Sequence, residues 1–134
     1  MKSVLLDTNI ILRYLTNDVP AQAEKVKKRF LEADEGKFQF EILPLTVVEM
    51  IYQLENWYEL SREEACRKIL TLFSPDWMVV KEKEVIFEVL NIYRLNKIDL
   101  VDLIIWTTAK NENKKLLSFD KDFDKLSPKI RLEP

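Results

Sequence analysis

The sequence predicts an α/β sandwich in which helices cover both faces of a mainly parallel sheet. Short apolar runs that are typical of buried strands alternate along the chain with segments whose apolar residues recur at helical spacing. This alternation favours parallel strands that are joined by helices. The length of 134 residues is that of one domain, so we expect residues 1–134 to form a single domain.

Each expected strand is a short apolar run, and the first two runs end at a polar residue or a proline. The run over residues 4–6 ends at Asp7, and the alternating run over residues 38–43 ends at Pro44. Further apolar runs lie over residues 77–80, 116–119 and 130–132. The last run is a candidate fifth strand, so the sequence predicts a sheet of four or five strands.

The expected helices begin and end at residues that favour helix termini. Pro20 suits the first turn of a helix that continues to about residue 34 and stops near Gly36. Ser61 and Glu64 have the spacing of a capping box, so another helix begins there. Helical spacing of apolar residues predicts the remaining helices over residues 8–16, 45–57, 84–95 and 99–111.

The composition excludes several kinds of catalytic site. The chain has no histidine, which rules out Ser-His-Asp and Cys-His catalysis and most zinc sites. The single glycine, Gly36, excludes a P-loop and a dinucleotide-binding fingerprint, because both need several glycines. Catalysis must therefore rest on carboxylates, Lys or Arg, hydroxyls, or a metal held by oxygen atoms.

Cysteine content and apolar runs bear on the compartment. The single Cys66 cannot form an internal disulfide, which suits a reducing cytoplasm. No apolar run approaches the ~18 residues of a membrane span, and no targeting segment is recognisable at the first residues. We therefore expect a soluble cytoplasmic protein.

Two carboxylates follow expected strands directly. Asp7 follows the first strand and Asp120 follows the fourth, and ligands of open α/β sheets bind at the carboxyl ends of strands. Taken singly, each carboxylate is explained as the N-cap of the next helix. Taken together, two acids at one edge of a sheet repel each other unless a positive charge lies between them.

Asp102 and Glu49 lie on expected helices and have opposite surroundings. Asp102 falls on an apolar stripe with Ile98, Ile105 and Trp106, where an unpaired carboxylate is costly. It should pair with a lysine, bind a metal or lie at the edge of a cleft. Glu49 falls on a polar stripe, so periodicity alone predicts a solvated position.

The acidic tail does not form a calcium loop. An EF-hand that begins at Asp120 needs glycine at its sixth position and glutamate at its twelfth, where this chain has Lys125 and Arg131. We expect Asp120 to be the functional acid of the tail, and Asp122 is a secondary candidate.

The net charge of −2 gives no global attraction for an anionic substrate. A nucleic-acid substrate would therefore need a local basic rim. Arg13 and Lys121 lie close in sequence to Asp7 and Asp120 and are the candidate substrate contacts. The denser basic run over residues 25–29 is spread around a helix, which favours a solvated face.

These residues together resemble the PIN-domain family, close to the toxin nucleases of VapBC toxin–antitoxin pairs. The resemblance rests on Leu6-Asp7-Thr8-Asn9 after the first strand, Glu49 in the third helix, Asp99-Leu100-Val101-Asp102 and Leu117-Ser118-Phe119-Asp120. It spans nearly the whole chain. It implies a PIN-like α/β/α sandwich with a twisted, mainly parallel sheet.

The resemblance also implies site residues and a cofactor. Asp7, Glu49 and Asp102 match the three acids most regularly tied to catalysis and metal binding, and Asp120 matches the fourth. Thr8, Asn9 and Ser118 match the supporting hydroxyl and amide positions, and Asp99 is a second acid one turn before Asp102. The implied activity is hydrolysis of RNA phosphodiester bonds with one or two Mg²⁺ or Mn²⁺ ions, leaving a 5′-phosphate and a 3′-hydroxyl.

The family further implies a homodimer and a VapB-like antitoxin that covers the active-site face. A PIN nuclease of RNA processing or quality control, without an antitoxin, is the alternative within the family. A PIN fold that binds RNA without cleavage is disfavoured because all four acids are present. A phosphoryl-accepting receiver domain is disfavoured because Lys81 stands after the third strand, where that class needs an aspartate.

Overall fold

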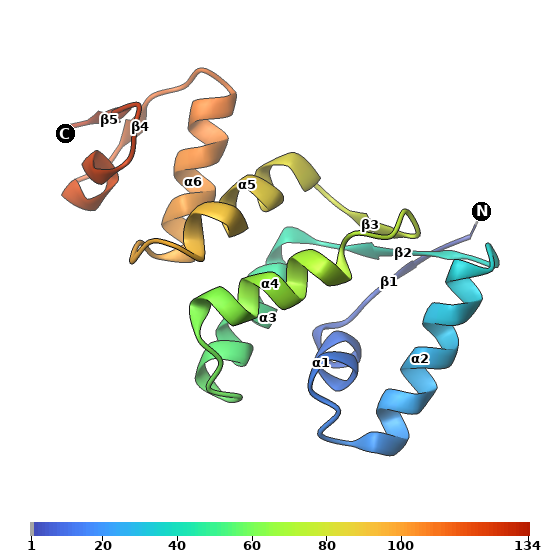
Figure 1. Cartoon of the computed structure of the whole chain (residues 1–134). Coiled ribbons are helices and arrows are strands. Elements are labelled where there is room, and N and C mark those ends of the chain that lie inside the picture. The colour runs from blue at the N-terminus through green and yellow to red at the C-terminus, as the bar shows by residue number, and fades with distance from the viewer. Residues whose placement is uncertain (1) are drawn as a thin grey trace.

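The computed structural model describes residues 2–134, and strands and helices alternate along them (Figure 1). The strands are β1 (Ser3–Leu5), β2 (Gln39–Ile42), β3 (Met78–Val80), β4 (Leu116–Leu117) and β5 (Arg131–Leu132). The helices are α1 (Thr8–Thr16), α2 (Pro20–Asp34), α3 (Pro44–Asn56), α4 (Arg62–Leu72), α5 (Lys83–Tyr93) and α6 (Leu100–Asn111). A 3₁₀ helix, η1 (Lys121–Lys125), separates β4 from β5.

All paired strands are parallel, but their hydrogen bonds divide them into two sheets. β1, β2 and β3 form one sheet in that order, with Val4 opposite Phe40 and Phe40 opposite Met78. β4 and β5 form a separate two-stranded sheet, with Leu116 opposite Arg131. The predicted α/β class with parallel strands is confirmed, whereas the five strands do not share one sheet within residues 2–134.

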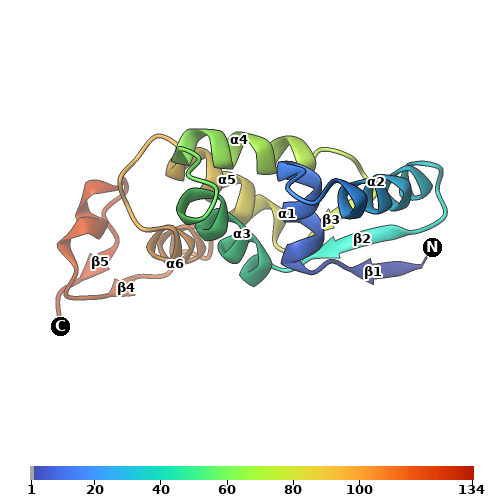
Figure 2. The same ribbon diagram turned by 90° about the horizontal axis from the view of Figure 1, so that it is seen from below.

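Helix α6 explains why the two sheets are separate. Its side chains Leu103 and Trp106 are buried, and Lys110 forms an ion pair with Glu88 of α5, so α6 packs along α5. β4 follows α6 after a short turn and therefore lies on the far side of α6 from β1, as both views show (Figures 1 and 2). A strand of two residues is too short for its sequence pattern to indicate which strand it pairs with.

The helix ends follow the chemistry that the sequence predicts. The Ser61 hydroxyl accepts a hydrogen bond from the Glu64 backbone N–H at 3.1 Å, which is the predicted N-cap of α4. Pro20 and Pro44 occupy the first turns of α2 and α3. Gly36 follows α2 with φ of 89°, a conformation that glycine adopts without steric cost.

One apolar core lies between the three-stranded sheet and the helices that follow it. Ile42, Met50, Leu54, Phe73 and Leu90 are all fully buried within it. The aromatic residues of the middle of the chain are divided, because Phe73 is buried while Trp57 is 80% exposed. No helix within residues 2–134 combines the length and apolarity needed to cross a membrane.

Candidate acidic site

The first acidic group lies where β1 meets α1. Asp7 is the N-cap of α1, and its Oδ1 accepts a hydrogen bond from the Thr8 backbone N–H at 2.8 Å. The buried Thr8 hydroxyl donates to Glu49 Oε2 of α3 at 2.7 Å. Gln53, one turn further along α3, donates to Glu49 Oε1 at 3.1 Å. Thr8 therefore joins the two acids that the sequence places 42 residues apart.

The second acidic group lies at the start of α6. Asp99 is the N-cap of this helix, and its Oδ1 accepts hydrogen bonds from the backbone N–H groups of Val101 at 2.9 Å and Asp102 at 3.3 Å. Asp102 is half-buried in the first turn. Burial raises the pKa of Asp102, and the negative charges of Asp99, Asp120 and Asp122 raise it further.

Residues after β4 complete the second group. The Ser118 hydroxyl accepts a hydrogen bond from the Asp120 backbone N–H at 3.0 Å, and Asp120 Oδ1 accepts one from the Asp122 N–H at 2.9 Å. Asp120 is thus the N-cap of η1, and Ser118 holds the turn before it. Lys121 is exposed in η1 beside Asp120, while Asp122 forms an ion pair with Lys125 at 2.9 Å.

Tyr52 links helix α3 to the second group, and the sequence interpretation missed it. Its hydroxyl donates to Asp99 Oδ2 at 3.4 Å, and it lies on α3 one turn after Glu49. Burial raises the pKa of Tyr52, and the charges of Asp99 and Asp102 add to the effect. The sequence feature that could have indicated Tyr52 is its spacing of three residues from Glu49, which places both side chains at neighbouring positions on one helix face.

The structure does not gather the four predicted ligands into one cluster within a single chain. Asp7 and Glu49 belong to the first group, and Asp102 and Asp120 to the second. Among residues 2–134, no three Asp, Glu, Cys or His side chains come close enough together to hold a metal ion. Their role as metal ligands therefore stays a prediction.

The two candidate substrate contacts have different surroundings. The Arg13 guanidinium forms an ion pair with Asp18 at 3.2 Å and donates hydrogen bonds to Gln22 at 2.8 Å and Tyr58 at 3.5 Å. These contacts tie α1 to the turn before α2. Asn9 and Lys121 are exposed, so both are accessible to a ligand. Substrate contact by Arg13 or Lys121 stays a prediction.

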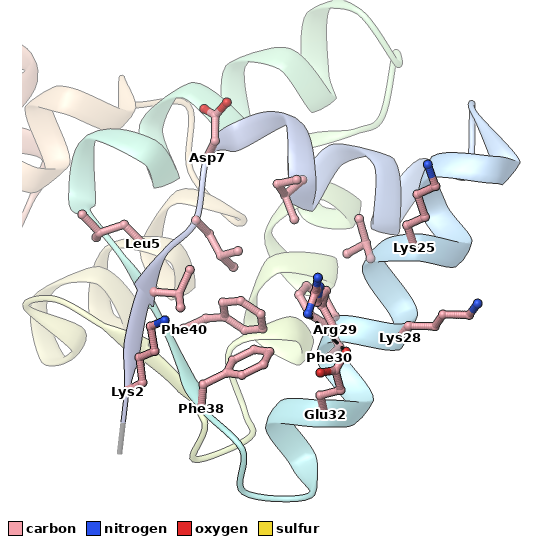
Figure 3. Close-up of a pocket in the computed structure, with 14 residues that line it drawn as sticks. Lys2, Leu5, Asp7, Lys25, Lys28, Arg29, Phe30, Glu32, Phe38 and Phe40 are labelled. Carbon is pink, nitrogen blue, oxygen red and sulfur yellow. Dashed lines mark hydrogen bonds and ion pairs between the residues drawn. The ribbon is translucent and has the colours of Figure 1, made fainter.

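A cavity of about 860 Å³ lies beside the first acidic group, between β1 and α2 (Figure 3). Phe30, Phe38 and Phe40 give it an apolar floor, and Asp7 lies at one end. The cationic side chains at its rim are Lys2, Lys25, Lys28 and Arg29. The sequence interpretation missed this cavity because its rim combines residues from β1 and α2 that are far apart in the sequence.

Comparison with known proteins agrees with the resemblance carried by these residues. The VapC ribonuclease of Aquifex aeolicus (strain VF5) is 25% identical over 123 residues, which cover 91% of this chain and 90% of that protein. A chain in the crystal structure of VapBC2 from Rickettsia felis bound to a DNA fragment from their promoter is 18% identical. That alignment covers 99% of this chain and 98% of that one, with a TM-score of 0.41. Residues 4–128, which include all four predicted acids, match the PIN domain, and the chain therefore belongs to the PIN-domain family.

Proposed function

We propose that this protein is a VapC-type endoribonuclease that hydrolyses RNA phosphodiester bonds as the toxin of a toxin–antitoxin pair. The observation that carries the proposal is the hydrogen-bonded Asp7–Thr8–Glu49 group at the carboxyl end of β1, the edge where α/β folds bind ligands. The VapC ribonuclease of Aquifex aeolicus, alignable over nine tenths of the chain, supports this reaction class.

The donor chemistry of both acidic groups suits Mg²⁺ or Mn²⁺, because both ions prefer oxygen ligands. The geometry of one chain does not suit them, since no three acids meet within residues 2–134. We therefore propose dependence on one or two divalent ions only for an active state in which the two acidic groups come together. We derive no catalytic step through an ion from the single chain.

The chain's own residues have definite tasks in this proposal. Thr8 fixes the Glu49 carboxylate, and Tyr52 fixes Asp99 beside Asp102. Lys121 and the exposed rim cations Lys25 and Lys28 supply positive charge for RNA phosphates, which the net charge of −2 does not supply. The remaining parts of the proposal are a cytoplasmic location, a homodimer and a VapB-like antitoxin partner.

A cleavage assay tests the proposal. Purified protein is incubated with a panel of structured RNAs in Mg²⁺ or Mn²⁺, with EDTA as the metal-free arm and Asp102→Asn as the matched inactive variant. We expect cleavage only with metal and wild-type protein, and products that carry a 5′-phosphate. Cleavage that persists in EDTA or in Asp102→Asn would contradict the proposed site.

The antitoxin part needs its own test. Expression of this chain alone should arrest bacterial growth, and co-expression of a small protein encoded by the adjacent gene should restore it. Growth that is unaffected by an active nuclease would instead favour an RNA-processing role without an antitoxin.

A further inference from the structure

The loop that leads into α6 carries part of the second acidic group and depends on a side chain from elsewhere. It spans residues 94–99, joins α5 to α6 and ends at Asp99. Within residues 2–134, the backbone carbonyls of Asn96 and Ile98 accept no hydrogen bond from a backbone N–H. A carbonyl that is withdrawn from water needs a partner, so a side chain has to supply the donors.

Arg62, the first residue of α4, supplies these donors. Its guanidinium donates hydrogen bonds to the Asn96 carbonyl and, at 3.0 Å, to the Ile98 carbonyl. Its Nε lies 3.6 Å from Glu55 Oε1 of α3, and its Cζ lies 3.8 Å from the centre of the Tyr93 ring. A planar guanidinium suits such a place, because it donates in several directions and also stacks on an aromatic face.

The partners of Arg62 are themselves fixed. Glu55 Oε2 accepts a hydrogen bond from the hydroxyl of the buried Tyr93 at 2.7 Å. The Glu55 and Arg62 side chains are only 19% and 30% exposed, so their ion pair is screened less than a fully exposed one. Because α4 packs against both α3 and α5, this Glu55–Arg62–Tyr93 cluster joins three helices (Figures 1 and 2).

The cluster connects the 94–99 loop to the helix that carries Glu49. Glu49, Tyr52 and Glu55 follow one another at three-residue spacing on α3, so they occupy neighbouring positions along one helix face. Tyr52 donates to the Asp99 side chain, and Glu55 reaches the same loop through Arg62. Helix α3 is therefore tied both to an acidic side chain and to the backbone just before it.

We propose that Arg62 is a positioning residue of the nuclease site. By holding the loop carbonyls against α3, it sets where Asp99 and Asp102 lie relative to Glu49. Its guanidinium is occupied by Glu55 and the loop, so it acts through the acids and not by contact with RNA. This role rests on the proposed nuclease function, whereas the hold of Arg62 on the loop does not.

Hydrogen exchange followed by mass spectrometry tests the hold on the loop without reference to activity. Arg62→Gln removes the charge and shortens the side chain, so we expect faster exchange in peptides that cover residues 96–103. Exchange in β1 and β2 should stay as in the wild type, because the loop opens locally. Unchanged exchange at residues 96–103 would overturn the proposal. Equally faster exchange throughout the chain would also overturn it, since Arg62 would then act on global stability alone.

Arg94→Gln is the matched control. Arg94 also joins α4 to α5, through an ion pair with Glu63 at 3.2 Å, and its side chain is 33% exposed. Its guanidinium donates to Glu63 and, within residues 2–134, to no backbone carbonyl. We expect exchange at residues 96–103 to stay close to wild type in this variant. If Arg94→Gln loosens these residues as much as Arg62→Gln does, the contacts of Arg62 with the loop are not the cause and the proposal fails.

Cleavage kinetics separate positioning from substrate binding. We expect kcat of Arg62→Gln to fall by about 10- to 100-fold, because small displacements of catalytic groups are costly. KM should stay within about twofold, since Arg62 contributes no binding to RNA. Arg62→Lys, which keeps the charge but not the planar fork, should lie between Arg62→Gln and wild type.

The opposite kinetic pattern would assign Arg62 a different role. A raised KM with unchanged kcat would make Arg62 an RNA contact and would overturn the proposal. Unchanged kcat and KM, despite a loosened loop, would overturn it as well. If the wild-type protein itself cleaves no RNA, the proposed function fails, while hydrogen exchange still decides whether Arg62 holds the loop.

Discussion

The most consequential single residue of the first acidic group is Thr8, which is buried at 3% exposure and bonds the Glu49 carboxylate. Thr8→Val keeps the shape of the side chain but removes the donor. We expect the free energy of unfolding to fall by about 1–3 kcal/mol, because the lost bond reaches a charged group. We also expect RNA cleavage to drop, since Glu49 is released. Urea unfolding and the cleavage assay measure the two effects.

For Thr107, the same Thr→Val substitution should have the opposite effect on stability from the one expected at Thr8. It is fully buried in α6, and its hydroxyl has no hydrogen-bond partner among the described residues. Thr107→Val replaces an unpaired polar atom with a methyl group, so we expect the free energy of unfolding to rise by up to about 1 kcal/mol with unchanged cleavage. A loss of stability would show that the hydroxyl is satisfied in solution.

Asp99 and Asp102 differ in what their side chains do. Asp99 caps α6, so Asp99→Asn should keep stability and most cleavage, whereas Asp99→Ala should cost about 1 kcal/mol of unfolding free energy. Within residues 2–134 the Asp102 side chain accepts no hydrogen bond from a backbone group, and it is half-buried among other acids. Asp102→Asn should abolish cleavage and slightly raise the melting temperature. The reverse pattern, with Asp99→Asn inactive and Asp102→Asn active, would reassign the ligand to Asp99.

Among the elements, the helix ends were predictable because capping is a local effect. Ser61, Pro20 and Gly36 act on backbone groups within a few residues, and the structure places them at the expected termini. The first three apolar runs became β1, β2 and β3. β4 and β5 also appear where expected, but the sheet that each joins depends on contacts of α6 that no local pattern encodes.

The turn between α1 and α2 gives a pH-dependent prediction. The hydrogen bond from the Tyr58 hydroxyl at 2.8 Å has the largest effect and lowers the pKa of Asp18. Burial, the next largest effect, raises this pKa, whereas Thr16 and Arg13 lower it, and the net shift is downward. A carboxyl whose pKa is lower in the folded state stabilises the fold above its unfolded pKa of about 3.9. That contribution is lost as the pH falls through the folded pKa.

Asp18→Asn should therefore melt below wild type at pH 7, and the difference should shrink below about pH 4. Thermal unfolding of both proteins between pH 2 and pH 7 measures this difference. A difference that is constant across the range would mean that the charge of Asp18 plays no part. Glu24→Gln, which removes only an exposed i,i+3 pair with Lys27, is the matched control and should change little.

At the scale of the whole molecule, the sequence predicted the identity of the acids better than their arrangement. The order of Asp7, Glu49, Asp102 and Asp120 carried the resemblance, and residues 4–128 match the PIN domain. Periodicity alone predicts that Glu49 lies on a solvated face, and its side chain is exposed. Hydrogen bonds from Thr8 and Gln53 nevertheless fix the position of its carboxylate. The separation of the acids into two groups depends on long-range packing, for which the sequence has no local signal.

This division predicts how the protein responds to metal. If Asp7 and Asp120 both hold Mn²⁺ in the active state, the ion binds the folded protein and raises its melting temperature by mass action. A metal concentration of about 100 times Kd gives about 2.7 kcal/mol, or roughly 5–10 °C for a chain of this size. Asp7→Asn and Asp120→Asn should each remove most of the shift, because each takes ligands from a different acidic group.

Glu112→Gln, an exposed acid after α6, is the control and should keep the full shift. A full shift in Asp7→Asn would remove Asp7 from the ligand set.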